Sequence, residues 1–115
     1  MVLVIGIIGI ISIQLTSATT YETRYHTGKY VSYDGQSAAL KITATVAMTS
    51  NSERITSSSA DYVRNITNSS YAIVAATTPA KGESSTTSLT WAGAVSFKRL
   101  GITYSTQAVS STYSI

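Results

Sequence analysis

Residues 38–48, AALKITATVAM, alternate apolar and polar side chains more regularly than any other stretch of the chain. One face of an extended segment would carry the apolar set: Ala38, Leu40, Ile42, Ala44, Val46 and Met48. The other face would carry Lys41, Thr43, Thr45 and Thr49. A period of two is typical of a strand with one buried face, so this segment predicts a central strand of a β-protein.

Shorter segments rich in strand-forming residues lie on both sides of this strand. They are residues 21–26, 29–33, 54–56, 62–64, 71–76, 88–98, 100–104 and 107–115. Asp34-Gly35 is a strong turn signal and Thr27-Gly28 a weaker one, while residues 49–60 and 77–88 are expected to be mainly loop. Gly93 is interpreted as a bulge. Seven or eight short strands predict an immunoglobulin-like antiparallel β-sandwich over residues 21–115. The expected core is Leu40, Ile42, Val46, Met48, Ile73, Trp91, Val95, Phe97 and Ile102.

The composition argues against several classes of function. The 115 residues fit one domain, and only 11% are charged, against the usual quarter. With 19 Ser and 18 Thr, the surface must be built from hydroxyl groups, which favours an exported protein. There is no cysteine, His26 is the sole histidine, and the net charge of +3 is scattered. These features predict no enzymatic activity, no metal or other cofactor, and no nucleic-acid partner.

The chain starts with an apolar segment, MVLVIGIIGIISIQL at residues 1–15, and its first charge is Glu22. A cleaved secretory signal would fit Thr16-Ser17-Ala18 as a cleavage site, but no Lys or Arg precedes the segment. A membrane anchor is marginal in length. A donor strand for a neighbouring subunit is also open, although the segment does not alternate. The remaining interpretation is a helix over residues 1–20 that is buried against copies of itself.

Gly6, Gly9 and Ser12 favour the last interpretation, because small residues at a spacing of three let helix backbones approach closely. The expected assembly residues are the apolar and small ones. They are Val2, Leu3, Val4, Ile5, Gly6, Ile7, Ile8, Gly9, Ile10, Ile11, Ser12, Ile13 and Leu15.

An uncharged apolar N-terminal segment followed by a Ser/Thr-rich β-domain resembles the archaeal type IV pilins. The resemblance is architectural and covers the whole chain. It implies that a basic leader is removed before Met1, that the segment holds the subunit in the membrane before assembly, and that copies then form an extracellular filament. It also implies an outer β-domain that is often glycosylated and adheres to a surface or a carbohydrate receptor.

Two N-glycosylation sequons lie close together, Asn65-Ile66-Thr67 and Asn68-Ser69-Ser70. Two of the three asparagines of the chain belong to them, so Asn65 and Asn68 are candidate modification sites on an outer loop. A polar turn without any glycan is the alternative.

We therefore expect a structural subunit of an extracellular, cell-surface filament that polymerises with copies of itself. Three alternatives stay open at this point. They are a donor-strand-complemented pilus or thread subunit, a virion coat or spike protein with a membrane-embedded N-terminus, and a membrane-anchored module that binds carbohydrate.

Overall fold

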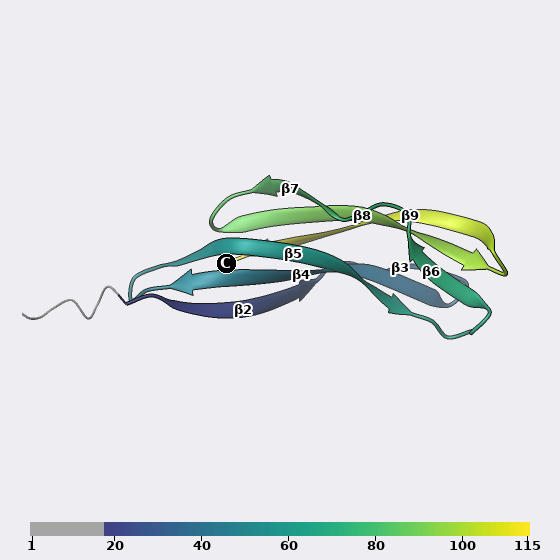
Figure 1. The fold of residues 1–115 in the computed structure, drawn as a ribbon, viewed down its shortest axis with the longest axis horizontal. Coiled ribbons are helices and arrows are strands. Elements are labelled where there is room, and N and C mark those ends of the chain that lie inside the picture. Colours follow the sequence, from purple (N-terminus) through teal and green to yellow (C-terminus); the bar gives the residue numbers. More distant parts are fainter. Residues whose placement is uncertain (1–17) are drawn as a thin grey trace, which may run out of the picture.

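The computed structural model describes residues 18–115, which form an all-β protein of two antiparallel sheets (Figure 1). Strands account for 73% of these residues, and none of them is helical. The first sheet contains β2 (Thr20–Thr27), β3 (Val31–Tyr33), β4 (Gln36–Met48) and β5 (Glu53–Asn65). The second sheet contains β6 (Tyr71–Ala75), β7 (Ala80–Ser84), β8 (Ser88–Arg99) and β9 (Ile102–Ser114). Each sheet is therefore built from one continuous half of the chain.

In the first sheet, β4 is central. It pairs with β5 along one edge, and its other edge pairs first with β3 and then with β2. Because β2 and β3 pair with the same edge of β4, they act as one long strand that is interrupted at residues 28–30. Asp34 and Gly35, with φ of 48° and 82°, turn the chain from β3 into β4. Positive φ at both central residues is the mark of a type I′ turn, which confirms the sequence prediction.

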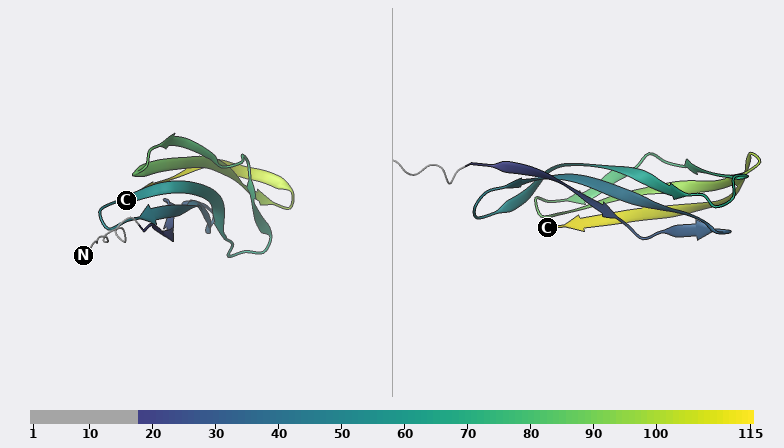
Figure 2. Two further views of the ribbon diagram at one scale, coloured as in Figure 1. Left: turned by 60° about the vertical axis from the view of Figure 1, so that its left-hand side comes forward. Right: turned by 90° about the horizontal axis from the view of Figure 1, so that it is seen from below.

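The second sheet repeats this plan, with β8 in the central place. β9 pairs with one edge of β8, and β6 and β7 pair with the other edge as the two parts of an interrupted strand. The long strands run lengthwise through the molecule, as Figure 1 and the right-hand view of Figure 2 show. A strand of 13 residues is about 44 Å long at about 3.4 Å per residue. The sandwich is therefore a rod, with loops gathered at its two ends.

The sheets approach each other closely where the interrupted strands break. A Cβ atom on Gly28, in the first break, would lie 2.1 Å from the backbone oxygen of Ser110 in β9. The second break lies between β6 and β7. There the Tyr62 hydroxyl of β5 donates to Thr77 O at 2.6 Å and accepts from Ala94 N at 3.0 Å. The Tyr62 hydroxyl lies 2.1 Å from where a Cβ of Gly93 would be. The last strand of each sheet thus closes against the interrupted strand of the other.

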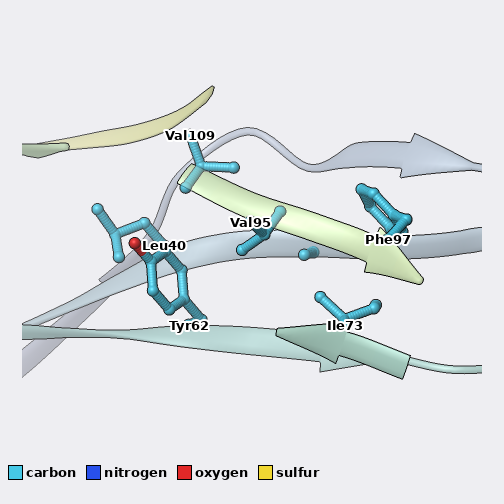
Figure 3. Packing of buried hydrophobic residues seen from close by; sticks show 7 residues of the cluster. Leu40, Tyr62, Ile73, Val95, Phe97 and Val109 are labelled. Carbon is cyan, nitrogen blue, oxygen red and sulfur yellow. The ribbon is translucent and has the colours of Figure 1, made fainter. Parts of the chain in front are cut away.

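The core is thin and forms two adjoining clusters along the rod. Figure 3 shows the first, where Leu40, Tyr62, Ile73, Val95, Phe97 and Val109 meet between the sheets. The second cluster is built from Ile42, Ala44, Val46, Ile55 and Leu89. Trp91 packs against both, and its indole N–H donates to Ser58 Oγ at 3.0 Å. Burial of these side chains between the sheets is the main stabilising contribution to the fold.

The fold class expected from the sequence, an N-terminal α-helix followed by an immunoglobulin-like sandwich, is wrong for the described residues. Thr20, the last residue of the expected helix, is the first residue of β2, and it is paired with Met48. The rest of the expected helix lies outside the described residues. An immunoglobulin-like sandwich exchanges strands between its sheets, whereas here each sheet is a consecutive meander.

Several expected boundaries are also wrong. The loop expected at residues 49–60 is mostly the first half of β5, and β7 lies within the loop expected at residues 77–88. Residues 100–115 contain one strand, β9, in place of two. Thr27-Gly28 joins two collinear strands and makes no hairpin. The expected core is confirmed for six of its nine residues, while Met48 and Trp91 are half-buried and Ile102 is 58% exposed.

Candidate functional site

The residues that could carry chemistry do not come together. His26 is exposed on β2, where its carbonyl oxygen accepts a long 3.4 Å hydrogen bond from Ser111 Oγ. Within residues 18–115, no three His, Asp or Glu side chains are close enough to hold a metal ion. A surface pocket of about 260 Å³ is lined by Glu83 and by hydroxyl side chains. These hydroxyls belong to Ser84, Ser85, Ser88 and Thr90. The pocket thus holds one carboxylate among hydroxyl groups.

The two ends of the rod differ, and we name them by their relation to the apolar N-terminal segment. The proximal end holds the start of β2, residues 49–52, residues 85–87 and the C-terminus. The distal end holds residues 34–35, 66–70 and 100–101. Figure 1 shows the proximal end on the left and the distal end on the right. The expected assembly residues, Val2 to Leu15, lie outside the described residues. The described chain begins at the proximal end, with the start of β2.

Near the proximal end, Arg24 of β2 forms side-chain hydrogen bonds to β5 and to β9. Its guanidinium donates two hydrogen bonds to the Glu53 carboxylate, at 2.9 and 3.2 Å, and another to Glu22. A further hydrogen bond of 3.4 Å reaches the Tyr113 hydroxyl on β9. The bond to Arg24 holds the pKa of Glu53 below its usual value, and the same partners raise the pKa of Arg24. Both side chains are partly exposed, so this pair fixes the geometry of the proximal end more than it stabilises the fold.

Gln36 organises the distal end from inside the protein. The residue is 1% exposed, and all four hydrogen-bonding positions of its side-chain amide are used. Its nitrogen donates to Asp34 O at 2.9 Å and to Thr67 Oγ1 at 3.0 Å. Its oxygen accepts from Thr67 N at 2.7 Å and from Asn68 N at 3.1 Å. A buried glutamine thus fixes the loop that carries both sequons.

Asn65 and Asn68 are both exposed, as the sequence analysis expects of modification sites. Asn65 is the last residue of β5, and its side-chain nitrogen donates a long 3.5 Å hydrogen bond to Ser37 Oγ. The side-chain oxygen of Asn68 accepts from the backbone N–H and the hydroxyl of Ser70, at 3.0 and 2.8 Å. The Asn68 amide nitrogen has no hydrogen-bond partner among the described residues. Asn68 is therefore the more accessible acceptor.

An aromatic cluster centred on Tyr33 fills the distal end. Its ring lies 6.2 Å from Phe97, 6.3 Å edge-on from Tyr71 and 6.3 Å stacked from Tyr104. Tyr104 has no partner on β8, because the register shifts between Phe97 and Lys98. This bulge directs the tyrosine onto Tyr33. This cluster could not be predicted from the sequence, since its members are separated by up to 71 positions and only the register brings them together.

Asp34 and Tyr71 connect the two sheets at this end. The Tyr71 hydroxyl donates to Asp34 Oδ2 at 2.6 Å. This hydrogen bond to a carboxylate, with burial, raises the pKa of Tyr71 above 10.0, because ionised tyrosine would place a negative charge beside another. The distal end is therefore held by polar contacts as well as by stacked rings.

Comparison of the chain with models of known protein families, with curated proteins and with solved structures finds no match. Among residues 18–115, there is no helix that is long and apolar enough to cross a membrane.

Proposed function

We propose that the protein is a non-enzymatic structural subunit of an extracellular filament, and that it assembles through the apolar segment of residues 1–15. The observation that carries the proposal is the arrangement of the rod. The described chain begins at one end of the rod, and within residues 20–115 the two sheets bury a core between them. An apolar segment without charged side chains, next to a sandwich that has a core of its own, is best buried against partners outside the subunit.

The surface of the rod supports the same conclusion. On the β8–β9 pair, five alternate registered pairs, on the face opposite the core, consist of small or hydroxyl-bearing side chains. The pairs are Ser88–Ser114, Thr90–Thr112, Ala92–Ser110, Ala94–Ala108 and Ser96–Thr106. Three of them are joined by hydroxyl–hydroxyl hydrogen bonds of 2.8 to 3.0 Å. Such a surface stays solvated with few charges, which suits the outside of a fibre.

The resemblance to archaeal type IV pilins belongs to this proposal and rests on the apolar segment and the hydroxyl-rich β-domain. In such an arrangement the segments of many copies meet at the centre, and the rods form the outer layer. Asn68, and next to it Asn65, would then carry glycans on the outside.

A charge in the apolar segment tests the proposal. We expect Ile8→Lys to abolish assembly of the full chain, because an unpaired ammonium group cannot be buried among apolar side chains at a tolerable free energy. Ile102→Lys is the matched control, since Ile102 is exposed at the distal end. Sedimentation and electron microscopy should show filaments for the wild type and the control alone. Filaments of Ile8→Lys, or a wild type that stays monomeric at high concentration, would contradict the proposal.

Glycosylation is tested separately by mass spectrometry of the chain from its own cells. We expect a glycan on the tryptic peptide that contains Asn68, and its loss in Asn68→Gln. If the peptide carries no glycan in any of the molecules, residues 65–70 form a polar turn without modification, and the glycosylation proposal is wrong.

A further inference from the structure

The turn between β8 and β9 carries an unusual residue at its apex. Leu100 and Gly101 have φ of 52° and 80°, so this turn has the same left-handed backbone as Asp34-Gly35 at the other hairpin of the distal end. Asp or Asn is favoured at the first position of such a turn, because its side chain tolerates positive φ. A leucine is disfavoured there by its Cβ. Strained positions that persist in a fold commonly mark function.

Leu100 is also the most exposed large apolar residue of the described chain, at 83%. It does not stand alone. Ile102 is 58% exposed, Tyr104 is 50% exposed, and Ile66 on the neighbouring loop is 46% exposed. Pairing of Tyr71 with Arg99 brings that loop beside the turn. We call these four residues, Ile66, Leu100, Ile102 and Tyr104, the apolar tip.

Positive charges flank the apolar tip. Lys98 and Arg99 directly precede Leu100, and Arg64 lies near the end of β5. Asp34 is the carboxylate at the distal end, and it accepts the hydrogen bond of Tyr71. Asp61 lies further back on β5, opposite Lys41. The three described glutamates lie at the other end of the rod, at residues 22, 53 and 83. The distal end therefore carries three cationic side chains against one carboxylate, whereas the glutamates of the proximal end are balanced by Arg24, Arg54 and Lys81.

We propose that the apolar tip inserts into the surface of a membrane that contains anionic lipid. Leucine, isoleucine and tyrosine side chains at the apex would enter the boundary between headgroups and acyl chains, while Lys98 and Arg99 would contact anionic headgroups. Tyr104 suits this boundary because its ring is apolar and its hydroxyl stays hydrated. The inference rests on the proposed function only in taking the distal end as the free end. Beyond the filament itself, it identifies an anionic membrane as the partner of the distal end.

A fluorescent label at each end separates insertion of the tip from binding through residues 1–15. The chain has no cysteine, so Ser69→Cys labels the distal end and Ser50→Cys the proximal end, both at exposed loop positions. Full chain with an environment-sensitive dye is mixed with vesicles of phosphatidylcholine alone or with added phosphatidylserine. We expect the emission at position 69 to shift to the blue with phosphatidylserine, and the shift to weaken as salt is raised.

Leu100→Asn is the decisive variant. Asn-Gly is the preferred sequence for this turn, so the fold should be retained or stabilised, while the apolar apex is lost. We expect binding measured at position 69 to fall by about tenfold or more, as removal of one inserted leucine implies. Lys98→Gln with Arg99→Gln should remove the preference for phosphatidylserine. In each case assembly should be unchanged, which distinguishes failure of this inference from failure of the filament proposal.

Three results would overturn the inference. One is an equal shift at position 69 with neutral vesicles. Another is unchanged binding by Leu100→Asn. The third is a shift at position 50 alone, which would place membrane contact at the proximal end.

Discussion

Gly28→Ala is the substitution that tests the closed architecture most sharply. Gly28 lies in the break between β2 and β3, and its N–H donates to Leu40 O at 2.9 Å. An added methyl group would lie 2.1 Å from Ser110 O and 3.0 Å from Ser111 Cβ. Since 3.4 Å is the start of ordinary contact, β9 and the interrupted strand must separate by about 1.3 Å. The obstructing atom is backbone, so no side-chain rotation can relieve the overlap.

The magnitude follows from this geometry. Overpacking a tight site costs about 1–3 kcal/mol, and a backbone obstruction belongs at the upper end, near 3 kcal/mol. For a domain of this size, about 4–8 °C of Tm are lost per kcal/mol, so Tm should fall by about 12–24 °C. The assay is thermal unfolding followed by circular dichroism.

Gly82→Ala is the matched control, because its added methyl would lie 3.6 Å from Thr90 O, an ordinary contact. Its effect on stability should stay within about 0.5–1 kcal/mol of zero. If Gly28→Ala keeps its Tm within about 4 °C of the wild type, the close approach of β9 to the break is refuted.

Three further predictions concern single contacts. Gln36→Met should lower the free energy of unfolding by about 2 kcal/mol in urea titrations, since two loop N–H groups lose their acceptor; an unchanged midpoint would contradict this. Because the pKa of Tyr71 is raised by Asp34, its contribution to stability is complete below pH 10.0 and is lost as the pH rises through the higher folded pKa. Tyr71→Phe should flatten this alkaline loss, and an equal loss in both proteins would argue against the contact. Gly93→Ala and Tyr62→Phe should be non-additive in a double-mutant cycle, because the added methyl meets the Tyr62 hydroxyl; simple additivity would refute that contact.

The alternation at residues 38–48 was enough to predict the central strand β4 and its buried face. The prediction works because a half-buried strand needs period two along its whole length. β5 was harder to predict, since its exposed positions include Ser57 and Ser59. Its inward side includes Ser58, whose hydroxyl accepts the hydrogen bond of the Trp91 indole. A polar residue at an inward position interrupts the alternation that predicts a strand, and its hydrogen-bond partner across the sandwich cannot be read from the sequence.

The distal end could not be derived from the sequence for a related reason. Ile102 was expected in the core because it is apolar, yet the left-handed Leu100-Gly101 turn places it on the surface. The exposure of Asn65 and Asn68 was predicted, whereas their support by Gln36 was not. Contacts between residues 31 positions apart depend on how the two meanders face each other, and local patterns do not specify this.

The most direct test of assembly through the apolar segment is disulfide cross-linking of the assembled full chain. Ile8→Cys supplies the only thiol in each copy, because the natural sequence has no cysteine. If the segments of neighbouring copies pack against one another, oxidation of Ile8→Cys should give covalent dimers. Ser69→Cys, at the distal end, should form no covalent dimers under the same conditions. Dimers of Ser69→Cys with none of Ile8→Cys would show that the segments do not meet, and would contradict the account.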